Sequence, residues 1–186
     1  MLVASLHQGI GEVLPTRLGF YENWLNPKGL REGTIGLAPL YAVLSFLRQE
    51  GALYGDITTR AGEYAAEWTV ADMSPTARRC LRALPTGVRR FFVVRQLGRF
   101  VRATYRPSRA ASETRRGTVR VDVRDSVFCV VRQPVAHALC GFYAAAFVRL
   151  LALFDLPVRA DMLTCRATGE PGCTMTLTPD DRGGEG

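Results

Sequence analysis

The chain has 186 residues, of which 47% are hydrophobic and 22% charged, and its formal net charge is +7. This length suits a single domain with a substantial core, and the composition excludes disorder over most of the chain. An arginine excess can mark an anionic partner, but these arginines alternate with apolar residues at helical spacing and match no nucleic-acid-binding motif. We therefore predict a solvated basic face without nucleic-acid binding, or arginines that meet carboxylates of an anionic ligand.

Cysteine usage and the absence of long apolar runs give an expectation about the compartment. The five cysteines are an odd number, and residues 1–12 do not resemble a secretory signal. The most apolar run, 138–154, is interrupted by Arg149 and is shorter than a membrane span requires. We expect a cytoplasmic protein without a membrane span, in which the cysteines are thiols or metal ligands.

Helical periodicity dominates the first 105 residues. Residues 1–34 carry Pro15, Pro27, Gly29 and Gly33, which predict short helical pieces and irregular connections. Apolar residues then recur at three- and four-residue steps, and Ser74-Pro75 has the form of a helix start. The predicted helices are 39–50, 56–73, a short one after Ser74, and 86–105. Gly62, Ala65 and Ala66 in the second of these predict close approach by another element.

The pattern changes after residue 117. Residues 107–117 are polar and predict a loop, whereas 118–124 alternate between valine and polar residues, as in a half-buried strand. A short strand is predicted at 127–131, an apolar helix at 134–154, and a strand hairpin formed by 158–166 and 173–178. The predicted fold class is α+β, a four-stranded antiparallel sheet packed against helices.

Three cysteines are candidates for one metal site. Cys165 and Cys173 bracket the turn of the predicted hairpin, and Cys140 lies on the apolar helix that would pack over it. Thiolates grouped in this way can bind a metal ion, although buried cysteines also serve as small core residues, and both interpretations stay open here. Cys129 is predicted to be a core residue of a strand, and Cys80 a packing residue or a site of acylation.

Three stretches carry a resemblance to a known family. They are the run from Gly117 to Ser126, the apolar helix with Cys140-Gly-Phe, and the run from Cys165 to Cys173. Together they resemble the 4-vinyl-reductase-type (hydrocarbon-binding) domain, in the superfamily of the TRAPP small subunits and bacterial phenol-sensor domains. The specific resemblance covers 117–177, so we predict one ligand-binding domain over 1–179 with a flexible tail at 180–186.

The resemblance implies a TRAPP-small-subunit-like homodimer with an apolar pocket between helices and sheet. In the sensor members, three cysteines and a glutamate bind zinc beside the pocket, and the cysteines match Cys140, Cys165 and Cys173. Met162 stands at the glutamate position, so Asp161 is the candidate fourth ligand of a structural zinc ion. His137, one turn before Cys140, is a second candidate ligand or a packing residue. No nucleotide cofactor is implied.

The side chains expected to line the pocket are mostly aromatic. Most aromatic residues occupy core positions, and those chosen as ligand-binding candidates are Tyr64, Trp68, Phe92, His137 and Phe142. The chain shows no serine–histidine–acid set, phosphate loop, dinucleotide fingerprint or paired-carboxylate pattern. The favoured function is therefore a non-catalytic protein that holds a hydrophobic, aromatic or tetrapyrrole ligand. The alternatives are an accessory protein or reductase acting on a vinyl tetrapyrrole in (bacterio)chlorophyll biosynthesis, and a protein-interaction or tethering module.

Overall fold

The protein is an α+β fold with a four-stranded antiparallel sheet, as predicted. The computed structural model describes residues 1–25 and 37–180, so Pro27, Gly29, Gly33 and the tail from residue 181 lie outside the described residues. The described helices are α1 (Leu2–Val13), α2 (Leu18–Leu25), α4 (Leu37–Gln49), α5 (Ala52–Ala71), α6 (Pro75–Ala83), α7 (Thr86–Thr104) and α8 (Gly141–Ala152). Short 3-10 turns are η1 (Pro15–Arg17), η2 (Val127–Cys129) and η3 (Arg166–Thr168).

The sheet has the strand order β1-β2-β4-β3. Its strands are β1 (Arg109–Arg115), β2 (Thr118–Arg124), β3 (Val158–Thr164) and β4 (Cys173–Pro179). The predicted strand at 118–124 and the hairpin are confirmed, but the fourth strand was placed wrongly. Residues 109–115 were expected to be a loop and form edge strand β1, whereas 127–129 form a 3-10 turn. β1 is almost entirely exposed, so its pairing depends on backbone hydrogen bonds to β2 and leaves no apolar alternation in the sequence.

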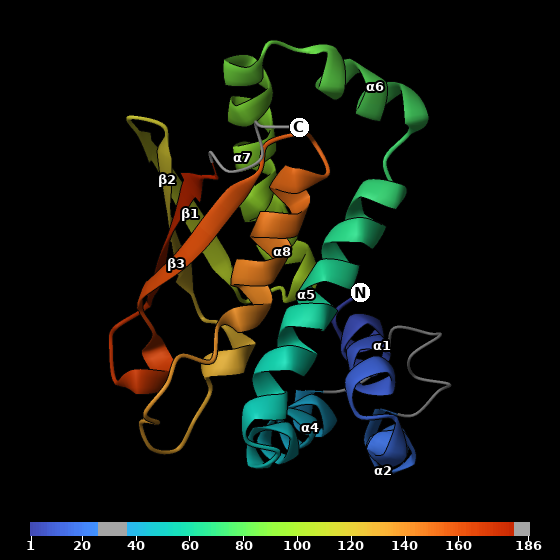
Figure 1. The fold of residues 1–186 in the computed structure, drawn as a ribbon. Helices are drawn as coiled ribbons and strands as arrows, with labels where there is room; N and C mark the ends of the chain where they lie inside the picture. The colour runs from blue at the N-terminus through green and yellow to red at the C-terminus, as the bar shows by residue number, and fades with distance from the viewer. Residues whose placement is uncertain (26–36, 181–186) are drawn as a thin grey trace.

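The helices form two layers on one side of the sheet (Figure 1). Helices α7 and α8 pack against the strands, and the long helix α5 packs on α8 with α1 on its other side. Gly62 permits the close packing of α5 on α8, because a Cβ atom there would lie 2.3 Å from the carbonyl oxygen of Phe142. Together with the buried Ala65 and Ala66, this confirms the predicted close approach.

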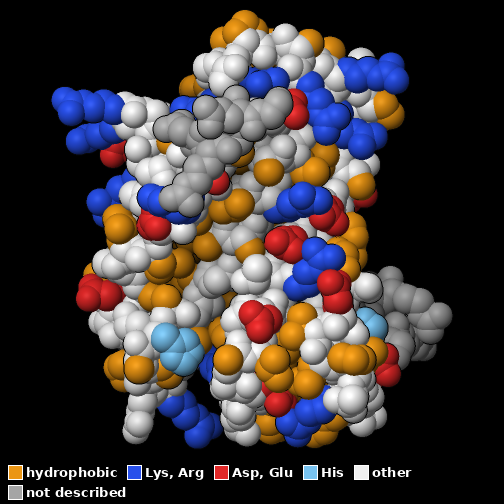
Figure 2. Space-filling model, viewed as in Figure 1, with side chains coloured by type: hydrophobic (Ala, Val, Ile, Leu, Met, Phe, Trp, Pro, Cys, Tyr) orange, Lys and Arg blue, Asp and Glu red, His pale blue; other side chains and the backbone are white. Residues whose placement is uncertain are grey.

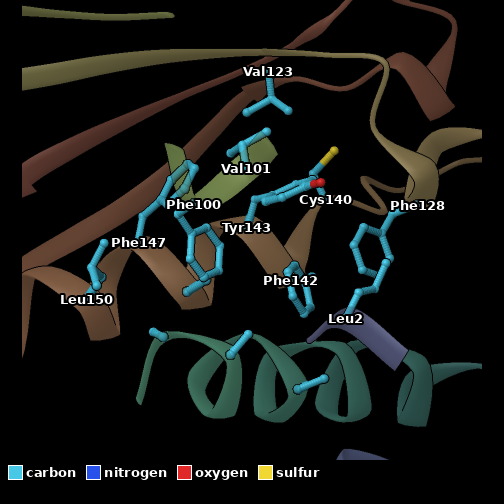
Figure 3. Packing of buried hydrophobic residues seen from close by; sticks show 14 of the residues in the cluster. Leu2, Phe100, Val101, Val123, Phe128, Cys140, Phe142, Tyr143, Phe147 and Leu150 are labelled. Atoms are coloured by element: carbon cyan, nitrogen blue, oxygen red, sulfur yellow. The ribbon is translucent and has the colours of Figure 1, made fainter. Parts of the chain in front are cut away.

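Aromatic side chains fill the interior between the sheet and α5 (Figure 3). The rings of Phe128 and Phe142 stack with centroids 4.7 Å apart, and Phe100 and Phe147 meet edge to face at 6.2 Å. These side chains are almost completely buried and belong to one cluster that runs from α1 to β4. The space between helices and sheet, where the sequence predicted a ligand pocket, is therefore packed with aromatic rings.

The apolar helix begins later than the sequence predicted. Residues 134–140 precede α8 as an irregular segment, and Cys140 is the residue that caps the helix. The backbone N–H of Val135 donates a 2.8 Å hydrogen bond to the carbonyl oxygen of Ala167, which ties this segment to the β3–β4 connection. Within residues 1–25 and 37–180, no helix is long and apolar enough to cross a membrane.

Candidate functional site

Four buried cysteine thiols meet at one end of the sheet. They come from η2, from the start of α8, from the residue after β3 and from the first residue of β4, and they are Cys129, Cys140, Cys165 and Cys173. All four sulfur atoms lie within 4.8 Å of one another. We call this group the thiol cluster. It joins three parts of the fold that are far apart in the sequence.

The sulfur positions approximate a tetrahedron. The Sγ atom of Cys129 lies 2.9 Å from that of Cys140 and 3.5 Å from those of Cys165 and Cys173. The other three separations are 2.9, 3.7 and 4.0 Å. A zinc ion with Zn–S bonds of about 2.3 Å requires sulfurs about 3.8 Å apart, whereas a disulfide requires about 2.05 Å. The four donors therefore fit one tetrahedral metal ion and could hold it with small adjustments.

Hydrogen bonds within the cluster divide the four thiols into two pairs whose pKa values shift in opposite directions. Hydrogen bonds with Cys129 and Cys140 lower the pKa of Cys165 and also that of Cys173. Hydrogen bonds with Cys129 raise the pKa of Cys140, and the pKa of Cys129 is raised as well, so the lowered pKa values belong to the two hairpin thiols. The backbone N–H groups of Leu139 and Arg166 each donate a 3.4 Å bond to one of these sulfurs. Such contacts orient and stabilise metal-bound thiolates.

Two long side chains hold the loops that carry the cluster. Arg48 of α4 donates from Nη2 to the carbonyl oxygen of Phe128, 3.0 Å away, beside Cys129. Tyr54 of α5 donates from its hydroxyl to the carbonyl oxygen of Leu139, 3.2 Å away, beside Cys140. Both cysteines are thus positioned by helices α4 and α5 as well as by their own segments.

The structure brings the three predicted cysteines together and adds Cys129 in place of Asp161. Asp161 lies on β3 opposite Thr176, three positions along β4 from Cys173, which corresponds to about 10 Å. Its carboxylate instead accepts a 3.2 Å bond from Nε of Arg159. A bulge does interrupt β3, but it falls between Met162 and Thr164 and leaves Asp161 on the exposed face. His137 is exposed on the segment before α8 and is not part of the cluster.

Sequence reasoning missed Cys129 because 127–131 was assigned to a strand, where a cysteine is ordinarily a core residue. The clue was its position directly after the clear alternation of 118–124, at a turn rather than within a strand. Cys80, by contrast, is exposed on α6 and takes no part in the cluster.

A cavity of about 330 Å³ lies at the opposite end of α8, between helices α5, α6, α7 and α8. Its walls are mostly apolar, and its polar side chains are Thr69, Gln96 and Arg99. The remaining lining residues are Met73, Leu81, Val93, Phe100, Ala103, Leu150 and Phe154. We call this space the helical cavity. It is formed between helices, whereas the predicted pocket was to be built on the sheet.

None of the five ligand-binding candidates lines the helical cavity. The hydroxyl of Tyr64 donates a 2.5 Å hydrogen bond to Glu12, and its ring lies 5.9 Å from that of Trp68 on the same helix, α5, with the two rings tilted by 30°. Phe92 is 41% exposed, whereas Phe142 is fully buried in the aromatic core. Thr69 and Val93 line the cavity directly beside Trp68 and Phe92 in the sequence, so these two candidates lie on the same helices as the cavity wall but on other faces.

Comparisons with known proteins give a likeness to solved structures. No family model matches the chain, and no curated protein matches it. A solved structure described as the phenol-responsive sensory domain of the transcription activator PoxR with phenol aligns with a TM-score of 0.47 and 16% identity. The alignment covers 77% of this chain and 74% of that one. None of these comparisons assigns the chain to the 4-vinyl-reductase-type family, so that membership stays a prediction.

Proposed function

We propose that the protein is a binding module that holds a small, largely apolar molecule in the helical cavity. The observation that supports this most is the cavity itself, an apolar space with three polar side chains, of which Gln96 and Arg99 lie about one turn apart on α7. Small-molecule sites are typically apolar clefts in which a few polar groups fix the orientation of the ligand.

The size of the cavity favours a compact ligand. Its volume of about 330 Å³ is near the lower end of the roughly 300–1,000 Å³ that is usual for ligand pockets. A ligand with one or two rings or a short alkyl chain fits this space better than a tetrapyrrole does. We therefore place the tetrapyrrole ligand and the reductase alternative behind a small hydrophobic or aromatic ligand. The tethering alternative would require a flat partner-binding surface, and we propose it only if the cavity binds nothing.

A variant that fills the cavity tests this function. Ala103 lines the cavity and is exposed, so Ala103→Phe should block the space without disturbing the core. Ala77→Phe, at an exposed position of α6 outside the cavity lining, is the matched control. Native mass spectrometry should find small-molecule cargo, or added decanol, on the wild type and the control but not on Ala103→Phe. Equal binding by all three proteins would rule out the helical cavity as the site.

We propose further that the thiol cluster holds a structural zinc ion. Four thiolates from different segments form a closed set without a position for water or substrate, which is typical of structural rather than catalytic zinc. When bound, zinc would supply a cross-link between η2, the start of α8 and the β3–β4 hairpin. Metal analysis of freshly purified protein should give one zinc per chain, and preparations without metal would contradict the proposal.

Two further expectations belong to the proposal. A homodimer is implied by the family resemblance and is supported by the half-buried side chains of Ala144, Ala145 and Val148 on α8, which line a shallow groove. Light scattering on the purified protein tests the homodimer, and a monomer mass would contradict it.

A cytoplasmic location is supported by five cysteines that are all free, as expected in a reducing compartment.

A further inference from the structure

Four arginine side chains surround a single cleft beside the helical cavity. The cleft has a volume of about 460 Å³ and is lined by Ala103 and by Arg99, Arg102, Arg106 and Arg109. Arg99 and Arg102 lie one turn apart on α7, Arg106 follows the helix, and Arg109 begins β1. We call this space the arginine cleft. Its four arginines come from the end of a helix, the turn after it and the start of a strand.

The charge of the arginine cleft is not balanced by carboxylates. Within residues 1–25 and 37–180, none of the four arginines forms an ion pair, although eight other arginines do. Arg99 donates to the side-chain oxygen of Gln96, and Arg109 donates to the backbone carbonyl oxygens of Arg106 and Ser108. Most of their N–H groups are therefore available for an external anion. Arginine forks match carboxylate and phosphate oxygens well.

The arginine cleft and the helical cavity are contiguous. Arg99 and Ala103 line both, so the mostly apolar walls of the cavity adjoin a space lined by four arginines. A neutral apolar ligand would leave the arginine side chains of the cleft without an anionic partner, and a small anion alone would leave the helical cavity unfilled. We propose that the ligand is an amphiphile, with an apolar body in the helical cavity and a carboxylate or phosphate group in the arginine cleft. This inference rests on the proposed function and adds the chemical class of the ligand.

The test compares ligands that share a tail and differ in the head group. Decanol, decanoate and decyl phosphate are titrated into the full chain by calorimetry at low ionic strength and below their critical micelle concentrations. Inorganic phosphate serves as the head group alone. The key variant is Arg102→Gln/Arg106→Gln, because both side chains are exposed and lie outside the helical cavity. Arg116→Gln/Arg132→Gln removes the same charge from exposed positions away from the cleft.

The expected result is that decanoate and decyl phosphate bind at least about tenfold more tightly than decanol, since one charged hydrogen bond is worth about 1.5–3 kcal/mol. This advantage should disappear in Arg102→Gln/Arg106→Gln, persist in the control and shrink as salt is added. The affinity for decanol should be the same in all three proteins.

Three results would overturn the inference. Equal affinity for decanol and the anionic ligands would leave a neutral guest in the cavity, so that the proposed function would stand without an anionic ligand. Inorganic phosphate that binds as tightly as decyl phosphate would show an anion site independent of the cavity. If no decyl compound binds, the proposed function fails together with the amphiphile.

Discussion

Replacing Cys129 tests the thiol cluster most directly, because this residue completes the set of four sulfurs. Serine is close to cysteine in size, so Cys129→Ser removes a thiolate with little change in packing at a site that is 3% exposed. Loss of an outer-shell partner already weakens metal binding by about 10–100-fold, and loss of a ligand should cost at least as much. Because the metal binds only the folded state, this weakening lowers stability by about 1.4–2.8 kcal/mol. For a chain of this length, the midpoint of thermal unfolding should fall by about 3–11 °C.

The assay is zinc content per chain together with thermal unfolding, with and without added zinc. Cys80→Ser is the matched control, since Cys80 is an exposed free cysteine outside the cluster. Asp161→Asn is a second control, because the carboxylate pairs with Arg159 rather than with the cluster. Both controls should keep one zinc and the wild-type midpoint. If Cys129→Ser also kept its zinc and its midpoint, Cys129 would not be a ligand and the tetrahedral arrangement would have to be abandoned.

Three further outcomes are expected. Gly62→Ala should destabilise the protein by about 1–3 kcal/mol in denaturant unfolding, because the new Cβ atom would overlap a carbonyl oxygen of α8. Gly55→Ala, on the same helix with open space around it, should stabilise the protein by about 0.5–1 kcal/mol. Equal effects of the two would contradict the packing of α5 on α8. Hydrogen bonds from Arg60 lower the pKa of Glu12, so this pair contributes stability above pH 4.5 that is lost as the pH falls through the lowered value. When thermal unfolding midpoints are measured as a function of pH, the midpoint of Glu12→Gln should fall less at low pH than that of the wild type. Cobalt substituted for zinc should give the intense sulfur-to-metal absorption of a tetrathiolate site, and a weak spectrum would argue for fewer thiolate ligands.

The sequence correctly predicted the helices and strands that have a periodic side-chain pattern or a helix-capping residue. The side chain of Ser74 accepts a hydrogen bond from the backbone N–H of Ala77 and caps the start of α6, as predicted. The valines of 118–124 face the core from β2. Edge strand β1 could not be found in this way, because nearly all its side chains are exposed and only its backbone is paired. The start of α8 was also missed, because a tertiary hydrogen bond from Val135 to Ala167 holds the preceding segment out of the helix.

The two candidate sites differ in how far the sequence could reveal them. Cysteine is chemically distinctive, so three of the four thiols of the cluster could be named from the sequence, and only the placement of Cys129 at a turn was missed. The helical cavity is lined by ordinary residues such as Val93, Leu150 and Phe154, whose identities do not separate a cavity wall from a packed core. Which face of α5 or α7 borders an empty space depends on how far α6 stands from its neighbours. That spacing is a tertiary property with no local pattern.

Helix α8 runs between the two candidate sites. Cys140 caps its first turn in the thiol cluster, and Leu150 and Phe154 line the helical cavity at its other end, roughly 15–20 Å away at 1.5 Å per residue. Between them, α8 is held by α5 through the contact at Gly62 and by the aromatic core (Figure 3). Figure 2 shows that basic side chains gather over α6, near the cavity end of the molecule, and at the tip of the β1–β2 hairpin. A zinc ion in the thiol cluster would thus fix α8 at the end away from the helical cavity, so we expect zinc loss to weaken the binding of decanol in the cavity through the position of this helix.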